Sequence, residues 1–339
     1  MGNNFEPGLP HLHFMNNCKP ELSFDSAVTD YAQWRGKVKS KLFELIGDIP
    51  EKCGPNIHME YESETELFYE KRIVFTSELF ADVPMHLLIP KQKNKPFPLV
   101  ICLQGHTTGA HISLGRAKYD GDAELIAGDR DFAVQAIKQG YAALAVELRC
   151  FGERSQDEPK PKDCVHSTMT ALLIGRTMIG ERIYDVSRAI DAIEQLRLPQ
   201  IDMTKIACMG NSGGGTITYY AAMLDERISV AMPSCYICTF KDSIGSIYHC
   251  PDNYLPGALK YFEMADLASL ITPRKMVVVA GREDNIFPVA GVNKAYETIE
   301  QIYDAAGVPG NCKLVIGSGG HRFYAGDAWR VFNELSGWK

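Results

Sequence analysis

The sequence predicts an α/β fold whose central sheet is mainly parallel and covered by helices on both faces, with a helical extension in front of it. Two observations predict this fold. From about residue 69 onward, short apolar segments of strand length alternate with amphipathic segments of helix length. Before that point the chain is helical in pattern or irregular. We therefore expect an N-terminal helical or irregular extension over residues 1–68 and one α/β domain over residues 69–339.

The first elements follow from the spacing of apolar residues. A helix is expected within residues 30–47, where apolar side chains recur at helical spacing: Tyr31, Trp34, Val38, Leu42 and Ile46. Residues 71–78 and 83–90 predict a pair of strands, and residues 98–105 a short buried strand that runs into a glycine.

The same alternation continues to the C-terminus. Helices are expected over 130–140, 180–196, 212–224 and 288–307, and strands over 141–149, 205–210, 228–234, 275–281 and 312–320, before a last helix. The charged, proline-rich residues 156–164 predict a surface excursion. Residues 236–268 interrupt the alternation, which predicts a lid or an insertion over the carboxyl edge of the sheet. In parallel sheets that edge holds the functional site.

Composition excludes several classes of protein. With 45% hydrophobic and 23% charged residues among 339, the chain is typical of globular proteins. Its 35 basic and 42 acidic side chains give a formal charge of −7, which argues against general nucleic-acid binding. The sequence has no apolar run of about 18 residues, so no membrane-spanning helix is predicted. The N-terminus lacks the basic and apolar regions of a secretory signal. We therefore expect a cytoplasmic protein without nucleic-acid or membrane partners, and leave its oligomeric state open.

A glycine-flanked serine stands where a strand is expected to turn into a helix. Residues 210–214 read G-x-S-x-G around Ser212, between the strand over 205–210 and the helix over 212–224. Such a turn is strained and crowded, so glycines must flank its tip, and the serine hydroxyl is then exposed at a helix N-terminus. The pattern predicts a nucleophile. The alternatives are a glycine-rich helix start and a phosphate loop, although the lysine of a phosphate loop is missing.

A base and an orienting carboxylate are expected after two later strands. Asp284 follows the strand over 275–281, and His321 follows the strand over 312–320. An activated serine needs a histidine base, which in turn needs a carboxylate partner. Glu283 competes with Asp284 for the carboxylate role; a helix-cap role is the alternative for Asp284. Asp284 is preferred because an apolar stretch and a helix start follow it directly.

Two backbone N–H groups are expected to bind the oxyanion of the intermediate. One is the N–H of Gly213, directly after the serine, and the other is that of His106, in the loop after the strand over 98–105. His106 and His111 also resemble a pair of metal ligands, but the amide interpretation is preferred and the imidazole of His106 is then incidental. Cys235 and Cys238 form C-x-x-C, but no second ligand pair accompanies them, so no metal is expected.

Arg149 and Glu153 lie at the end of the strand expected over 141–149 and just after it, and are therefore expected at the same carboxyl edge of the sheet. Two roles are open for them. They position a polar substrate, or, as is more common for charged residues at loop edges, they tie two loops together.

The motifs at residues 103–106, 147–154, 209–215, 279–289 and 319–323 resemble those of the α/β-hydrolase superfamily, most closely its acetyl xylan esterase and dienelactone-hydrolase-like branch. The resemblance covers the chain from about Tyr69 onward. It implies an α/β-hydrolase fold with Ser212 as nucleophile, Asp284 as orienting acid and His321 as base. Two departures are Gln104, where many relatives carry histidine, and Gly213, where the deacetylase branch often carries glutamine.

Together these features predict a serine hydrolase that cleaves carboxylic esters through an acyl-enzyme, with small acetyl-like esters of sugars or other polar molecules as substrates. No cofactor is expected. The alternatives are a peptidase or thioesterase on the same fold, and a binding protein without catalysis.

Overall fold

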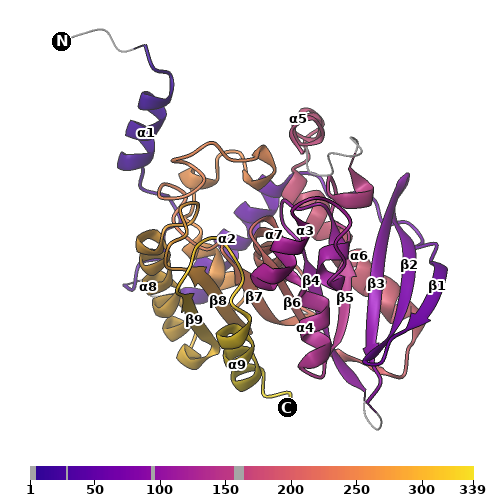
Figure 1. Cartoon of the computed structure of the whole chain (residues 1–339). Helices are drawn as coiled ribbons and strands as arrows, with labels where there is room; N and C mark the ends of the chain where they lie inside the picture. The colour runs from indigo at the N-terminus through magenta and orange to yellow at the C-terminus, as the bar shows by residue number, and fades with distance from the viewer. Residues whose placement is uncertain (1–4, 28–29, 93–95, 156–163) are drawn as a thin grey trace.

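The computed structural model describes residues 5–27, 30–92, 96–155 and 164–339. These residues form one nine-stranded sheet (Figure 1). Its strands are β1 (His58–Glu64), β2 (Phe68–Glu78), β3 (Ala81–Pro90), β4 (Phe97–Leu103), β5 (Ala142–Val146), β6 (Ile201–Asn211), β7 (Ile228–Ser234), β8 (Lys275–Gly281) and β9 (Cys312–Gly317). Of the surface excursion predicted at 156–164, all but the last residue lies outside the described residues.

The sheet is antiparallel at one end and parallel over the rest. Its strand order is β1-β2-β3-β5-β4-β6-β7-β8-β9, and the pairs β1–β2, β2–β3 and β3–β5 are antiparallel while all later neighbours are parallel. Because these neighbouring strands run parallel, their carboxyl ends meet at one edge of the sheet. The prediction of a mainly parallel sheet with helices is confirmed.

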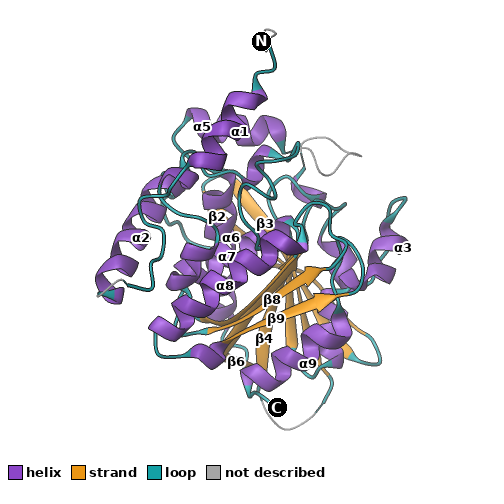
Figure 2. Cartoon of the chain, turned by 90° about the vertical axis from the view of Figure 1, so that its left-hand side faces the viewer, coloured by secondary structure: helices purple, strands orange, loops and turns teal. Residues whose placement is uncertain are grey.

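Helices cover both faces of the sheet (Figure 2). The described α-helices are α1 (Gly8–Asn17), α2 (Tyr31–Ile46), α3 (Asp122–Leu125), α4 (Phe132–Lys138), α5 (Val165–Leu173), α6 (Met178–Leu196), α7 (Gly213–Leu224), α8 (Val289–Ala305) and α9 (Ala325–Ser336). Side chains of α2, α6, α7 and α8 pack in one core cluster, and those of α4 and α9 pack in a second. The sheet side chains divide between these two clusters, because successive residues of a strand point to opposite faces.

The extension holds the predicted helix α2. Its N-cap is Asp30, whose carboxylate accepts a hydrogen bond of 2.9 Å from the N–H of Gln33. The expected apolar stripe is buried in the larger core, except for the partly buried Tyr31. By contrast, no residue of α1 is buried, and this helix stands away from the body of the molecule (Figure 1).

The expectation of only helical or irregular chain before residue 69 is wrong for β1. This strand pairs with β2 and forms one edge of the main sheet. Its sequence is HMEYESE, and all but one of its residues are exposed. Because the strand buries almost no side chain, it carries no apolar alternation by which the sequence could reveal it.

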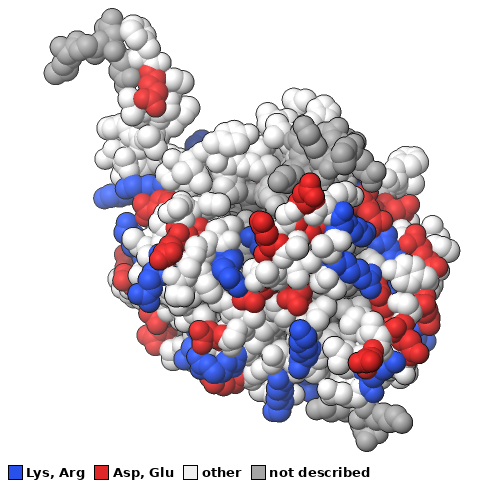
Figure 3. Space-filling view, in the orientation of Figure 1, with Lys and Arg blue, Asp and Glu red and all other residues white. Residues whose placement is uncertain are grey.

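Residues 236–268 lie between β7 and β8, where the interruption is predicted, and carry short 3₁₀ turns: Pro251–Asn253, Ala258–Lys260 and Ala265–Leu270. No described helix has the length and apolar character needed to cross a membrane. Acidic and basic side chains are interspersed over the face shown in Figure 3.

Candidate active site

Ser212 occupies the sharp turn between β6 and α7. Its backbone has φ 59° and ψ −124°, a strained conformation for a residue other than glycine. The N–H of Ser212 donates a hydrogen bond of 2.9 Å to the carbonyl of Ser234, at the end of β7. The turn is therefore fixed by the neighbouring strand and places Ser212 at the N-terminus of α7.

The glycines around Ser212 are required by close backbone contacts. A Cβ on Gly210 would lie 2.5 Å from the carbonyl oxygen of Gly214, and one on Gly214 would lie 2.2 Å from that of Leu103. No side chain fits at either position. These contacts are the steric reason for the glycines that the sequence pattern suggested. They favour the strained turn over the alternative interpretation, a helix start that is merely rich in glycine.

Asp284 and His321 lie together. The Nδ1 of His321 is 2.8 Å from Oδ2 of Asp284. The other carboxylate oxygen accepts hydrogen bonds from the N–H groups of Ile286 (2.8 Å) and Phe287 (3.1 Å). Burial raises the pKa of Asp284, but its hydrogen bonds outweigh burial and hold the pKa below the usual value. An ionised carboxylate therefore faces Nδ1 of His321, and Glu283 is exposed.

The second ring nitrogen of His321, Nε2, is buried and has no hydrogen-bond partner among the described residues. It therefore forms no hydrogen bond with the hydroxyl of Ser212. In enzymes that activate a serine with a histidine, the bond between these two side chains is often loose before a substrate binds. A buried ring nitrogen that lacks a partner is available to accept a proton.

Two contacts connect the Ser212 turn to the Asp284–His321 pair. Cys235 follows Ser234, and its sulfur lies within 4.8 Å of ligand atoms of both Asp284 and His321. Arg130 reaches the pair from another side, because its Nη2 donates to the carbonyl of His321 at 3.3 Å. The same nitrogen lies 3.3 Å from the side-chain amide of Asn211, directly before Ser212, in the amide orientation that satisfies its neighbours.

The loop after β4 lies against the Ser212 turn. A Cβ on Gly105 would lie 2.6 Å from the Asn211 carbonyl and 2.9 Å from the N–H nitrogen of Gly213. The N–H of Thr107 donates to the carbonyl of Gly105 at 2.7 Å, a γ-turn centred on His106. The two predicted oxyanion donors, the N–H groups of His106 and Gly213, thus belong to neighbouring backbone segments.

Gln104 anchors this loop from behind. Its side-chain amide nitrogen donates to the hydroxyl of Ser113 at 2.8 Å and to the carbonyl of Arg130 at 2.7 Å. The residue is buried. At this position, where the sequence resemblance would have histidine, Gln104 therefore holds the loop in place.

A row of rings extends from His106 to His321. The ring centroids of His106 and His249 are 6.3 Å apart, those of His249 and Phe287 are 6.1 Å apart, and Phe287 stacks on His321 at 5.9 Å. His249 comes from the 236–268 segment, which therefore contributes to the site. Burial lowers the pKa of His249, and the charge on His106 adds to this effect.

The imidazole of His106, incidental in the sequence interpretation, has a definite partner. Its Nε2 is 3.2 Å from Oδ2 of Asp252, and Arg182 donates to the same carboxylate oxygen at 2.6 Å. Burial raises the pKa of Asp252, but Arg182 and His106 outweigh burial and hold the pKa far below the usual range. Sequence reasoning missed Asp252 and Arg182, because charged residues far apart in a chain carry no sign that they meet.

Two groups of described side chains have the ligand types that metals prefer: Cys235 with Asp284 and His321, and His106 with Cys164, Cys250 and Asp252. In the second group Arg182 donates to Asp252 and also lies 3.3 Å from the sulfur of Cys164. A guanidinium in that position repels a cation and uses the same lone pairs. Cys235 and Cys250 fall into different groups, so the C-x-x-C does not form one site with Cys250.

His111 is also paired elsewhere. Its Nε2 lies 2.8 Å from Oδ2 of Asp122. The suspected pair of metal ligands at 106 and 111 is therefore divided between two different carboxylates.

Arg149 and Glu153 do not pair with each other. Arg149 bonds to carboxylates of β2 and α6, namely Glu78 at 2.7 Å, Glu181 at 3.0 Å and Asp185 at 2.7 Å. Glu153 pairs with Arg72 of β2 at 2.7 Å. Both side chains tie the loop after β5 to its neighbours, so the substrate-positioning role has no support from these contacts.

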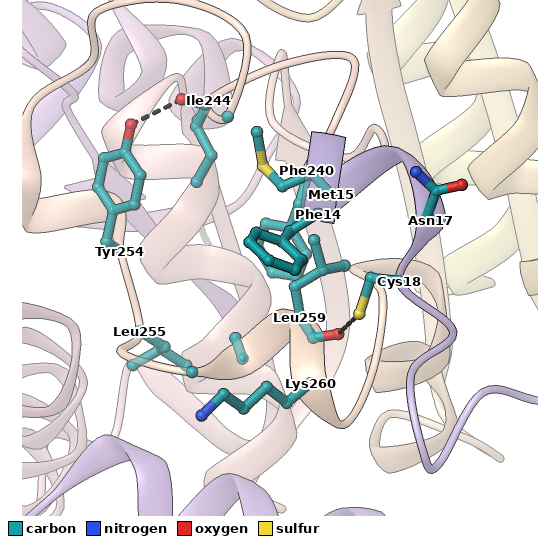
Figure 4. A pocket seen from close by; sticks show the side chains of 13 residues that line it. Phe14, Met15, Asn17, Cys18, Phe240, Ile244, Tyr254, Leu255, Leu259 and Lys260 are labelled. Carbon is teal, nitrogen blue, oxygen red and sulfur yellow. Dashed lines mark hydrogen bonds between the residues drawn. The ribbon is translucent and has the colours of Figure 1, made fainter. Parts of the chain in front are cut away.

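An apolar cavity of about 500 Å³ lies between α1 and the 236–268 segment (Figure 4). Phe14 and Met15 of α1 line it together with Phe240 and Leu259, and Cys18 donates a hydrogen bond to the carbonyl of Leu259. None of the predicted catalytic residues lines this cavity. It is therefore separate from the Ser212 turn.

Comparison with known proteins places the chain in a family. A profile of the Abhydrolase family matches residues 8–314. "Putative hydrolase YtaP" of Bacillus subtilis (strain 168) is 27% identical over 294 residues, which cover 85% of this chain and 94% of that protein.

Solved structures share the fold at low sequence identity. A putative acetyl xylan esterase from Bacteroides fragilis is 16% identical with a TM-score of 0.78, covering 99% of this chain and 90% of that one. A glucuronoyl esterase from Solibacter usitatus is 14% identical with a TM-score of 0.70, covering 94% and 97%. The predicted resemblance to the α/β-hydrolase superfamily is thus confirmed, and the chain belongs to the Abhydrolase family.

Proposed function

We propose that the protein is a serine hydrolase that cleaves carboxylic esters through an acyl-enzyme. One observation carries the proposal: Ser212 occupies a strained strand-to-helix turn at the same sheet edge as the His321–Asp284 pair, and Nε2 of His321 has no hydrogen-bond partner among the residues that the structure describes. Esterase names among the structural relatives support ester hydrolysis.

In the proposed reaction, the Ser212 oxygen attacks the ester carbonyl while Nε2 of His321 takes the hydroxyl proton. Asp284 holds the proton on Nδ1 and stabilises the imidazolium that forms. The protonated His321 then gives its proton to the leaving alcohol as the carbon–oxygen bond breaks. Water, activated by Nε2, attacks the acyl-enzyme and releases the acid. The N–H groups of His106 and Gly213 are the proposed donors to each oxyanion.

The proposed substrates are small acetyl-like esters of sugars or other polar molecules. The resemblance to acetyl xylan esterases supports this class. A panel of acetylated sugars and aryl esters of increasing acyl length tests it: turnover is expected to fall as the acyl chain lengthens. Equal or higher turnover of long acyl chains would contradict the small-acyl proposal.

The test of the nucleophile is turnover of p-nitrophenyl acetate by the Ser212→Ala variant. Loss of the nucleophile is expected to lower kcat by about 10⁴-fold or more. Ser229→Ala is the matched control, because it also removes one partly buried hydroxyl, which donates to the Ile206 carbonyl at 3.0 Å, outside the site. The control is expected to keep wild-type turnover. Wild-type activity in Ser212→Ala would overturn the proposed function.

A further inference from the structure

The His106 imidazole lies in a pocket that fixes its orientation. One ring nitrogen, Nε2, faces Asp252 at 3.2 Å. The ring also packs edge-on against Phe151 at 5.1 Å between centroids, and Arg182 lies over that same phenyl ring at 4.3 Å. Contacts on Nε2 and on the ring edge leave Nδ1 to point in another direction.

The surroundings of this imidazole favour its charged form. Asp252 faces it, the Cys164 sulfur lies 3.9 Å from Nε2, and His249 lies at its edge. The sulfur of Cys250 also lies within 4.8 Å of a ring nitrogen of His106. Arg182 donates hydrogen bonds to Asp252 and Cys164, which lie between it and the imidazole. Burial disfavours the charge, but the hydrogen bond and attraction to Asp252 dominate and raise the pKa of His106 to about 9. At neutral pH Nδ1 therefore carries a proton.

Nδ1 of His106 lies near the start of α7. A Cβ on Gly213 would lie 3.3 Å from Nδ1 of His106 and 3.5 Å from Cε1. Gly213 is the first residue of α7, so its N–H has no partner within the helix. Because residue 213 has no side chain, the edge of the imidazole that carries Nδ1 and Cε1 lies close to the start of α7. The contacts with Asp252 and with the Cys164 sulfur are both made by the other ring nitrogen, Nε2.

We propose that the side chain of His106, through Nδ1–H, is a third and positively charged donor to the oxyanion formed at Ser212, with Asp252 and Arg182 as its positioning residues. This inference rests on the proposed function. The oxyanion gains its charge when Ser212 attacks and loses it when the leaving group departs. His106 keeps its proton throughout, so it differs from His321, which exchanges one. The ligand class is a tetrahedral centre with a negatively charged oxygen, which a boronate adduct of Ser212 imitates.

The test compares His106→Ala and His106→Asn with wild type on p-nitrophenyl acetate, a neutral ester. Both variants keep the backbone N–H at 106, so any loss reports the side chain. His106→Ala is expected to lower kcat by about 100-fold with little change in KM, because the interaction exists only in the transition state. The amide of asparagine keeps an N–H near the position of Nδ1, so His106→Asn is expected to recover part of the loss. Phenylboronic acid is expected to inhibit His106→Ala at least about 10-fold more weakly than wild type.

The pH profile separates this role from a structural one. Wild-type kcat/KM is expected to fall as pH rises through about 9, where the imidazolium loses its proton, and this fall is expected to be absent from His106→Asn. His111→Asn is the matched control, because it breaks another His–Asp pair, with Asp122 at 2.8 Å, away from Gly213. It is expected to keep the wild-type profile.

Unchanged kcat in His106→Ala, or an alkaline fall that persists in His106→Asn, would overturn the inference. Should His106→Ala fail to fold, the profile of His106→Asn still decides. Neither result would affect the proposed function, which stands or falls with Ser212→Ala.

Discussion

Two histidine–aspartate pairs lie at the edge of the sheet near Ser212. They differ in the ring nitrogen that meets the carboxylate. In the first pair His321 uses Nδ1 to bond Asp284, and its Nε2 has no partner in the described part of the chain. In the second pair His106 uses Nε2 to face Asp252, which leaves Nδ1 toward Gly213. The choice of ring nitrogen therefore decides which atom of each imidazole is offered to the reaction.

The carboxylates of the two pairs also have different partners. Asp284 is held by two backbone N–H groups and has no cationic side chain bonded to it among the described residues. Asp252 is bonded by the fully buried Arg182. The two backbone N–H groups that hold Asp284 carry no charge. Asp252, which a buried arginine keeps ionised, favours the positively charged form of His106. The two proposals therefore give the same two residue types different roles, a base in the first pair and a fixed charge in the second.

Replacing the aspartate of the first pair is expected to have the larger effect. Asp284→Asn removes the negative charge and allows the wrong ring tautomer on His321, so Nε2 no longer accepts the serine proton. We expect kcat for p-nitrophenyl acetate to fall by about 10⁴-fold. Glu283→Gln, one residue away and exposed, is the control and is expected to keep wild-type turnover. A loss below about 10-fold in Asp284→Asn would remove Asp284 from the mechanism.

Replacing the aspartate of the second pair is expected to have a smaller effect of another kind. Asp252 raises the pKa of His106, so Asp252→Asn is expected to move the alkaline fall in kcat/KM from about pH 9 toward neutral pH. Below that fall the loss in kcat is expected to be about 10-fold or less. The variant also leaves Arg182 without its carboxylate, so urea denaturation is expected to show lower stability. An unshifted alkaline fall in a folded Asp252→Asn protein would contradict the coupling.

The sequence predicted those parts of the molecule that bury apolar side chains in a regular pattern. The stripe of α2 and the run of parallel strands are examples, and they confirm the fold class. The strand β1 could not be predicted, because its side chains stay exposed. Its place in the sheet depends on backbone pairing with β2.

Ser212 was predicted from the glycines that flank it, and Asp284 and His321 from the rule that polar residues after parallel strands share one edge. The second pair followed no such rule. Asp252 lies in a 3₁₀ turn between strands, and Arg182 lies on the helix α6, where a charged residue normally predicts a solvated face. Only the folded chain shows that the two meet in the interior, 70 residues apart in sequence.

The most direct measurement of the central claim is the rate at which a fluorophosphonate ester labels the protein, with the labelled residue identified by peptide mass spectrometry. A fluorophosphonate reports the activated serine without depending on the natural substrate. The account predicts one adduct, on Ser212, formed about 10³-fold or more slowly in His321→Ala than in wild type. An adduct at another residue, or an equal labelling rate in His321→Ala, would contradict it.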